Sequence, residues 1–259
     1  LEGERIDNLP YEEMRKIRGR RIGAIFQDPL TSLYPLYTVG EQLVETILTH
    51  MALSEKEARK RAIDLLEEVG IPSAVERIDH YPHQFSGGMR QRVVIALALC
   101  AEPRLIIADE PTTALDVSIQ AQIITLLKRL CKDHGTAVML VTHDMGVIAE
   151  TADRVAVMYA GRIAESGPVA EVVKNANHPY THGLMGSIPK VGHEVERLTQ
   201  IDGSMPRLTE IPAGCAFNPR CTEKGPRCMT ERPILEPVGH SFVACWKFDP
   251  EGTGAEVST

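Results

Sequence analysis

Two short apolar runs separated by a helical pattern constrain the fold of this chain most strongly. The runs are residues 105–108 and 137–141, and residues 118–131 between them have the pattern of a helix. Continuous apolar runs of this length are typical of strands buried on both faces, as in parallel sheets. A strand, a helix and a second parallel strand are joined by a right-handed crossover. The sequence therefore predicts an α/β fold around a parallel sheet, and residues 21–26 add another short strand.

Local signals place further elements around this unit. Ser54 and Glu57 form a capping box that opens a helix over residues 54–70. Residues 155–158 and 162–164 predict a hairpin that closes the regular part of the chain.

The character of the sequence changes beyond about residue 176, where proline, glycine and cysteine become more frequent and long apolar strands disappear. We therefore predict a domain over residues 1–176 and a smaller extension over residues 177–259.

Composition excludes several classes of protein. Of the 259 residues, 43% are hydrophobic and 24% are charged, which is sufficient for a packed core. The net charge of -7 gives the chain no overall electrostatic reason to bind nucleic acid or an anionic membrane surface. No apolar run approaches the roughly 18 residues of a membrane span, and the start shows no signal-peptide pattern. The first residue is Leu, so we expect a processed product or a fragment.

An acidic pair follows the first apolar run. Asp109 and Glu110 come at the carboxyl end of the strand predicted over residues 105–108, the edge where open α/β sheets bind ligands. Asp109 is placed to hold Mg²⁺, which takes one or two carboxylates together with phosphate oxygens. Glu110 is placed to polarise an attacking water molecule. The alternative is a strand that ends at an exposed acidic turn.

A glycine pair precedes that strand and opens a helix. Ser86 can cap the helix, while Gly87 and Gly88 allow backbone N–H groups to approach a phosphate closely. The start of a helix also attracts anions through its dipole. Taken alone, the same residues describe an ordinary helix cap.

Three further polar residues occupy comparable positions. His143 follows the second apolar run and can donate a hydrogen bond to a terminal phosphate, and Gln27 follows the strand at residues 21–26, from which it can reach a metal ion or water. Asp116 follows the acidic pair and either caps the next helix or reaches a partner subunit. Each of these residues is weak support on its own.

The order of these motifs resembles that of the ATP-binding subunits of ABC transporters. Gln27, the loop Ser86–Gly87–Gly88, the pair Asp109–Glu110, the segment 114–116 and His143 match in turn the Q-loop, the signature loop, Walker B, the D-loop and the H-loop. The resemblance spans roughly residues 22–165. It implies a P-loop NTPase-like core with a parallel sheet and a helical signature subdomain over about residues 38–101.

The resemblance also implies a role for each matching residue. Glu110 would be the catalytic base, His143 the sensor of the γ-phosphate and Asp109 the Mg²⁺ ligand. Gln27 would couple the site to membrane subunits. Ser86, Gly87 and Gly88 would contact the ATP that the opposite subunit holds. Gln91 and Asp116 would be further nucleotide-binding residues.

One expected motif is missing. No G-x-x-x-x-G-K-[ST] occurs in the 259 residues, so they contain no phosphate-binding loop with its lysine. We expect N-terminal truncation rather than a naturally inactive subunit, and weak ATP binding by these residues alone.

Two segments narrow the resemblance to the dipeptide and oligopeptide importers. Residues 86–92, with Met89 after the glycines, are similar to the D-type ATPase of these systems, and residues 26–33 are similar to the same group. Residues 178–181 resemble the start of the C-terminal extension found in peptide, opine and nickel importers, although they also fit a plain loop-to-helix turn.

The extension contains four cysteines within 31 residues, in the spacing C-x5-C-x6-C-x16-C: Cys215, Cys221, Cys228 and Cys245. With no secretory signal, clustered cysteines favour metal binding over disulfides. Four thiolates can hold a [4Fe–4S] cluster or a Zn²⁺ ion, although the tighter C-x2–4-C pairs of zinc sites are absent. The resemblance to peptide-importer subunits favours the iron–sulfur cluster, and unligated thiols remain an alternative.

The resemblance implies that the chain binds and hydrolyses ATP to energise a bacterial importer of dipeptides or oligopeptides. Its partners would be a second ABC ATPase subunit, two transmembrane permease subunits and, indirectly, a substrate-binding protein. It would be a peripheral protein at the cytoplasmic face of the inner membrane. Three alternatives stay open: a nickel or opine importer ATPase, a non-catalytic subunit that completes its partner's site, and a soluble ABC protein of DNA repair or translation, which the charge disfavours.

Overall fold

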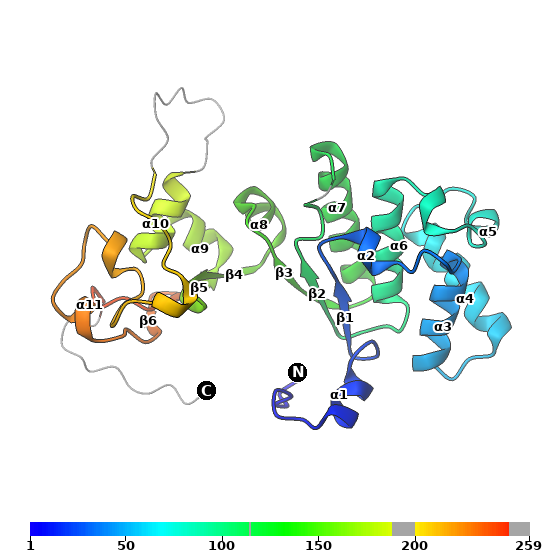
Figure 1. The fold of residues 1–259 in the computed structure, drawn as a ribbon, viewed down its shortest axis with the longest axis horizontal. Helices are drawn as coiled ribbons and strands as arrows, with labels where there is room; N and C mark the ends of the chain where they lie inside the picture. Colours follow the sequence, from blue (N-terminus) through cyan, green and yellow to red (C-terminus); the bar gives the residue numbers. More distant parts are fainter. Residues whose placement is uncertain (114, 188–199, 249–259) are drawn as a thin grey trace. The chain divides into compact units, whose positions relative to one another are not determined.

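The computed structural model describes residues 1–113, 115–187 and 200–248 (Figure 1). Contacts within the chain divide it into two compact units, unit 1 over residues 1–143 and unit 2 over residues 144–259. The domain boundary predicted at residue 176 thus differs from the division by contacts, because the hairpin before residue 176 pairs with a strand after it. Where the ABC core itself ends stays a prediction.

Unit 1 contains a three-stranded parallel sheet in the order β1-β2-β3. Its elements are α1 (Tyr11–Ile17), β1 (Ile22–Ile25), α2 (Pro29–Ser32), α3 (Val39–His50), α4 (Glu55–Glu68), α5 (Ala74–Arg77), a 3₁₀ turn (Pro82–Gln84), α6 (Gly87–Leu99), β2 (Leu105–Asp109), α7 (Val117–Asp133) and β3 (Ala137–Val141). The three strands and the crossover helix α7 confirm the predicted α/β fold.

The core of unit 1 lies between the sheet and α6, and extends into the helices beyond. Ile25, Ile106 and Ala108 point from the sheet into one buried cluster with the apolar residues of α6 and α7. Figure 1 shows α3, α4 and α5 together on the far side of α6 from the strands. Gly23 permits the close approach of β1 to α6, because a Cβ atom there would lie 2.5 Å from the carbonyl oxygen of Ala98.

The helices of unit 1 begin where their capping residues are. Ser54 and Glu57 form the predicted capping box, in which the Ser54 N–H donates to Glu57 Oε2 at 2.8 Å. Thr38 and Glu41 form a second capping box at the start of α3. A capping residue of this kind stabilises a helix by about 1 kcal/mol. The four helices α3–α6 occupy residues 39–99, inside the range predicted for the helical subdomain.

One prediction about the sheet is wrong. The apolar run of β3 indicates a strand buried on both faces, but Val138, Met139 and Val141 are 38%, 49% and 46% exposed. The reason is its position, since β3 is the last strand of the sheet and has no neighbour on its outer edge among the described residues of unit 1. By contrast, β2 is the central strand and buries Ile106 and Ala108 completely.

Unit 2 is built on an antiparallel sheet in the order β4-β5-β7-β6. Its elements are α8 (Met145–Thr151), β4 (Arg154–Tyr159), β5 (Arg162–Pro168), α9 (Val169–Lys174), α10 (Pro179–Gly186), 3₁₀ turns at Leu208–Glu210 and Asn218–Arg220, α11 (Arg227–Thr230), β6 (Glu236–Val238) and β7 (Ser241–Val243). The pair β4–β5 is the predicted hairpin. Pairing of Glu165 and Ser166 with Val243 and Phe242 attaches the end of the described chain to it.

A buried carboxylate organises the start of α10. Glu165 in β5 is fully buried, and its carboxylate accepts hydrogen bonds from the backbone N–H groups of Asn177 and His178 at 2.9 and 3.0 Å. The His178 ring then caps α10 by accepting from the Tyr180 N–H at 3.0 Å. Burying a carboxylate without such bonds is costly, so these contacts make Glu165 fix where the chain turns from the hairpin into the extension.

We predict that unit 2 loses stability between pH 6.5 and about 4. Burial lowers the pKa of His178 from 6.5 to about 4, so in that window the unfolded chain binds a proton that the folded chain excludes. Stability is therefore complete above pH 6.5 and falls by about 3 kcal/mol as the pH approaches 4. Denaturant unfolding followed by the fluorescence of the single Trp, Trp246, measures this change in unit 2.

His178→Asn keeps a residue that can cap α10 and should abolish most of this pH dependence. His240→Asn, at an exposed histidine of the same unit, should leave it unchanged. Equal pH slopes in the wild-type and His178→Asn proteins would contradict the assignment.

Candidate functional site: the carboxyl edge of the parallel sheet

The candidate site lies where the three parallel strands end. Ile25 of β1 pairs in register with Ala108 of β2, and Asp109 pairs with Val141 of β3. The residues after these strands therefore lie along one edge of the sheet. This geometry brings three of the predicted positions together, since Gln27 follows β1 and His143 follows β3, with the acidic pair of β2 between them.

Glu110 is the centre of a hydrogen-bond network at this edge. Its Oε1 lies 2.9 Å from Nδ1 of His143, and its Oε2 accepts from Nε2 of Gln27 at 2.9 Å and from Oγ1 of Thr113 at 2.8 Å. A carboxylate has about four acceptor positions. These three bonds leave the carboxylate one position for a water molecule or substrate hydroxyl.

The backbone of Glu110 holds the side chain in this place. Its φ angle is 43°, in the left-handed region, and its N–H donates to the Val141 carbonyl at 2.8 Å. A left-handed residue other than glycine costs roughly 1–3 kcal/mol, and such residues concentrate at functional sites. The bond to Val141 and the three side-chain bonds together maintain the strained conformation.

The same bonds keep the carboxylate ionised. The hydrogen bond with His143 is the largest cause that lowers the pKa of Glu110, and the hydrogen bond from Thr113 comes next. The side chain of Glu110 is 26% exposed, whereas that of His143 is 77% exposed. The site can therefore present the ionised carboxylate of Glu110 to a water molecule. The His143 ring, bonded to Glu110 through Nδ1, keeps its other nitrogen, Nε2, for solvent or a ligand.

Asp109 ends β2 at the same edge and is exposed to solvent, one residue before Glu110. A carboxylate in this position, next to the Glu110 carboxylate on which three side chains converge, is suited to Mg²⁺ with phosphate oxygens as further ligands. The structure thus fits the predicted donor set in residue type and location.

The predicted glycine loop forms the start of α6. Ser86 is the N-cap, and its Oγ accepts from the Met89 N–H at 3.4 Å. Ser86 and Gly87 are exposed. A Cβ atom on Gly88 would lie 3.0 Å from Ile119, near the start of α7, so this loop and the loop before α7 pack side by side.

Asp116 stands at the N-cap position of α7 but makes no capping hydrogen bond with its side chain in the described part of the chain. Its side chain is exposed. The sequence allows either a helix cap or a contact beyond the subunit. The described residues show no side-chain cap, and the contact beyond the subunit stays a prediction. Residue 114 of this segment lies outside the described residues.

Gln91 differs from the other predicted residues. It is fully buried in α6, and neither its Oε1 nor its Nε2 has a hydrogen-bond partner among the residues that the structure describes. The helix starts at Gly87, so Gln91 lies one turn in and faces the core rather than the exposed loop. A direct contact between Gln91 and a nucleotide in solvent is not compatible with this placement.

Thr113 also belongs to the network, as a residue that the motifs of the sequence do not include. Its N–H also donates to the Glu110 carbonyl at 3.2 Å, which closes a turn after the strand. A hydroxyl residue three positions after a strand-end carboxylate is the signal that points to such a contact.

The four cysteines of the extension lie near one another. The Cys215 N–H donates to the Cys228 carbonyl at 2.9 Å, and none of the four forms a disulfide. Burial is the first cause that raises the pKa of Cys215, Cys221 and Cys245, and charge on the neighbouring thiols raises it further.

Four thiols are a donor set for zinc or iron. However, no group of three or more possible ligands is arranged to hold a metal ion among the residues that the structure describes. The donor chemistry therefore fits a metal, but the side-chain arrangement is not a coordination cage.

No helix in the described ranges is sufficiently long and apolar to span a bilayer.

Comparisons with known proteins agree with this geometry. The family model for ABC transporters matches residues 1–113, and the model for the oligopeptide/dipeptide transporter C-terminal region matches residues 164–228. The oligopeptide transport ATP-binding protein AppD of Bacillus subtilis is 46% identical over 97% of this chain and 77% of its own length. The dipeptide transport ATP-binding protein DppD of the same organism is 50% identical, over 96% of this chain and 75% of its own length.

Solved structures include similar folds. A dimeric ATP-binding cassette bound to ADP and phosphate is 34% identical, with a TM-score of 0.57 over 65% of this chain and 72% of that one. A cbiO1 protein from Clostridium perfringens, part of an ABC transporter complex, is 32% identical with a TM-score of 0.56, over 66% of this chain and 67% of its own. The chain therefore belongs to the ATP-binding proteins of ABC transporters, in the group with the oligopeptide/dipeptide transporter C-terminal region.

We predict an order for the three donors to Glu110. Removing His143 with His143→Ala should raise the pKa of the Glu110 carboxyl most, Thr113→Val less and Gln27→Ala least, because this is the order in which the three hydrogen bonds lower it. A carbon-detected NMR titration of the Glu110 carboxyl measures the three values. Thr125→Val, which removes a hydroxyl bonded within α7, is the control and should cause no change. If Gln27→Ala raises the pKa of Glu110 more than His143→Ala does, the predicted order of the three hydrogen bonds is wrong.

Proposed function

We propose that this chain is the ATP-binding and ATP-hydrolysing subunit that energises a bacterial ABC importer of dipeptides or oligopeptides. The observation that carries the proposal is the network in which Gln27, Thr113 and His143 converge on the Glu110 carboxylate. It joins the ends of three parallel strands at the edge where nucleotide-binding sheets hold their ligands. Relatives named for oligopeptide and dipeptide transport support the substrate class.

In this proposal Glu110 is the catalytic base. Its ionised carboxylate accepts a hydrogen bond from the attacking water at the position that its three partners leave open, and takes up a proton as the water attacks the γ-phosphate in line. His143 uses Nδ1 toward Glu110, which leaves Nε2 of its exposed ring for the γ-phosphate. Gln27 orients the carboxylate and senses the metal or water, so most of the catalysis is positioning.

Asp109 would hold Mg²⁺ through water, and the metal would neutralise charge on the phosphate oxygens. ATP would lie between two subunits. Ser86, Gly87 and Gly88 would then contact the nucleotide of the opposite subunit through exposed backbone N–H groups at the start of α6, and Asp116 would reach across the same boundary. Gln91 would act from inside α6 by shaping this loop rather than by touching ATP.

The 259 residues contain no G-x-x-x-x-G-K-[ST] sequence. We propose that a polypeptide limited to these residues hydrolyses ATP slowly or not at all, because hydrolysis also needs the backbone cradle and lysine of a phosphate-binding loop. ATPase activity is therefore measured on a form of the protein that includes such a loop.

Glu110→Gln should lower ATP turnover by a factor of about 10²–10⁴, because it removes the base but keeps the size and part of the hydrogen bonding of the side chain. ATP binding should be retained. Steady-state phosphate release and equilibrium binding of a fluorescent ATP analogue measure the two quantities. Glu67→Gln, at an exposed residue of α4, is the matched control. If Glu110→Gln hydrolyses ATP as fast as the wild type, Glu110 is not the catalytic base.

An exposed apolar surface that follows Gln27 and α2 in the chain supports docking to permease subunits. Leu36 is 82% exposed, and it lies between Tyr34 and Tyr37, which are 71% and 54% exposed and contact each other edge to face. These three residues follow the loop that contains Gln27, so a partner on this surface could sense the state of the site. The chain would then be peripheral at the cytoplasmic face of the inner membrane, with a substrate-binding protein as an indirect partner.

Leu36→Glu should weaken assembly with the permease subunits by about tenfold or more, because a charge replaces an apolar contact in the centre of the surface. ATPase activity without permease should be unchanged. Co-purification from detergent and the stimulation of ATPase activity by permease measure the effect. Val75→Glu, at an apolar residue of α5 that is 61% exposed, is the control. Normal assembly of Leu36→Glu would contradict the docking surface.

We further propose that Cys215, Cys221, Cys228 and Cys245 hold a [4Fe–4S] cluster, with Zn²⁺ as the alternative. The extension is small and has a limited core, so a metal centre bound by its four thiols would stabilise its fold. Loading would require the thiols to lose protons and to rotate toward a common centre, because burial raises the pKa of three of them and they do not form a cage in this structure.

Anaerobic purification should give a brown protein with about four iron and four sulfide per chain. Cys228→Ser should lose the colour and the metal, whereas Cys131→Ser, in α7 of unit 1, should keep both. One zinc per chain would favour the alternative, and a metal-free protein would leave the four residues as thiols without a ligand.

A further inference from the structure

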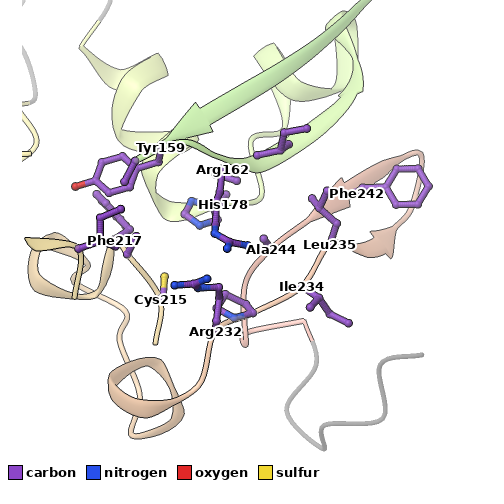
Figure 2. A pocket seen from close by; sticks show the side chains of 16 residues that line it. Tyr159, Arg162, His178, Cys215, Phe217, Arg232, Ile234, Leu235, Phe242 and Ala244 are labelled. Carbon is purple, nitrogen blue, oxygen red and sulfur yellow. The ribbon is translucent and has the colours of Figure 1, made fainter. Parts of the chain in front are cut away.

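Unit 2 contains a large cavity that the proposed ATP chemistry does not use. Its volume is about 720 Å³, within the range of small-molecule sites. The walls come from the β4–β5 hairpin, from the segment that contains Cys215, and from residues 232–235 before β6 (Figure 2). All of these parts belong to unit 2, so the cavity does not depend on the placement of the two units.

The lining is mostly apolar, and its charged side chains are cations. Ile163, Ile211, Phe217 and Leu235 contribute the apolar surface, and none of the 16 lining residues is Asp or Glu. Three apolar side chains of the lining, Ile163, Ile234 and Phe242, are 38–43% exposed. A cavity of this kind offers a hydrophobic environment that a ligand can reach from solvent.

Two arginines give the cavity its charge. Figure 2 shows Arg162 extending from β5 into the cavity and Arg232 extending into it from the opposite wall. Neither side chain forms an ion pair with an acidic residue in the described ranges, where the nearby Glu231 is paired with Arg227 instead. His178 also lines the cavity, but burial lowers its pKa to about 4, so it adds no charge at neutral pH.

Two guanidinium groups that have no ion-pair partner within the described ranges thus lie beside apolar walls, in a chain with a net charge of -7. This combination matches one class of ligand. Guanidinium groups bind carboxylate and phosphate oxygens with two parallel hydrogen bonds, and the attraction is stronger next to an apolar surface than in water. We propose that this cavity is a binding site for a small amphipathic anion, with its oxyanion head on Arg162 and Arg232 and its apolar body against Ile163, Phe217 and Leu235.

Such a ligand would connect the two parts of unit 2. One arginine belongs to the β4–β5 hairpin and the other to the extension, so a ligand held by both stabilises the pairing of β5 with β7. Binding to the folded form alone raises the stability of unit 2 with ligand concentration. The inference goes beyond the proposed ATPase function and needs neither ATP nor a partner subunit.

Isothermal titration calorimetry on the full chain tests the site with three probes that carry the same octyl chain: nonanoate, octyl phosphate and neutral 1-octanol. We expect one-to-one binding of at least one anion with a Kd on the order of 100 µM, and binding of 1-octanol at least about tenfold weaker. The two anions distinguish a carboxylate ligand from a phosphate ligand. Octyltrimethylammonium, which has the same chain and a positive head, should not bind.

Substitutions test the charged part and the apolar part of the site separately. Arg162→Gln and Arg232→Gln should each weaken anion binding about tenfold and bring it close to that of 1-octanol, because each removes one charged partner of the head. Ile234→Asn should weaken the anions and 1-octanol alike. Arg154→Gln, at an exposed arginine of β4 that does not line the cavity, is the matched control and should bind as the wild type does.

Circular dichroism and Trp246 fluorescence verify that each variant is folded, which is expected since both cavity arginines are exposed. The proposal is overturned if neither anion binds below the millimolar range, if the cationic probe binds as tightly as the anions, or if the folded arginine variants retain full affinity.

Discussion

The alignment of three parallel strand ends is the constraint on which the candidate site depends. Gln27, Glu110 and His143 are separated by 83 and 33 residues, yet each lies within 2.9 Å of its partner, because β1, β2 and β3 end at the same edge. A shift of one residue in either strand pairing would turn the side chains of that strand to the other face. Burial of Ile25 of β1 and of Ile106 and Ala108 of β2 in the core of unit 1 prevents this shift, so the hydrophobic core also fixes the geometry of the polar edge.

Glu110 combines a strained backbone with a carboxylate that is hydrogen-bonded by three side chains. The left-handed backbone at Glu110 is unfavourable on its own, but the bond from its N–H to Val141 and the three bonds to its carboxylate compensate for it. The result is a carboxylate whose orientation and ionisation are set before any substrate arrives. This kind of preorganisation is what a reaction that depends on positioning and electrostatics requires.

Unit 2 is organised by a different principle. Glu165 is buried and fully bonded to backbone N–H groups at the start of α10, and the rings of Tyr159, Tyr180 and Phe217 pack against one another beside it. The cysteine segment packs against this aromatic cluster, and Tyr159 and Phe217 also line the cavity that contains the two arginines. The extension therefore has its own core and its own chemistry, which its attachment through β5 and β7 joins to the hairpin.

Local sequence was sufficient for much of this protein. The apolar runs determined β2 and β3, the capping box determined the start of α4, and the order of short motifs predicted which residues meet at the edge of the sheet. Only the tertiary structure decided the rest, because burial depends on neighbours that are distant in sequence. It left β3 exposed at the edge of the sheet, placed Gln91 inside the core, brought Thr113 to Glu110 and joined β7 to β5. It also collected Arg162 and Arg232, which are 70 residues apart, around one cavity that no local pattern indicates.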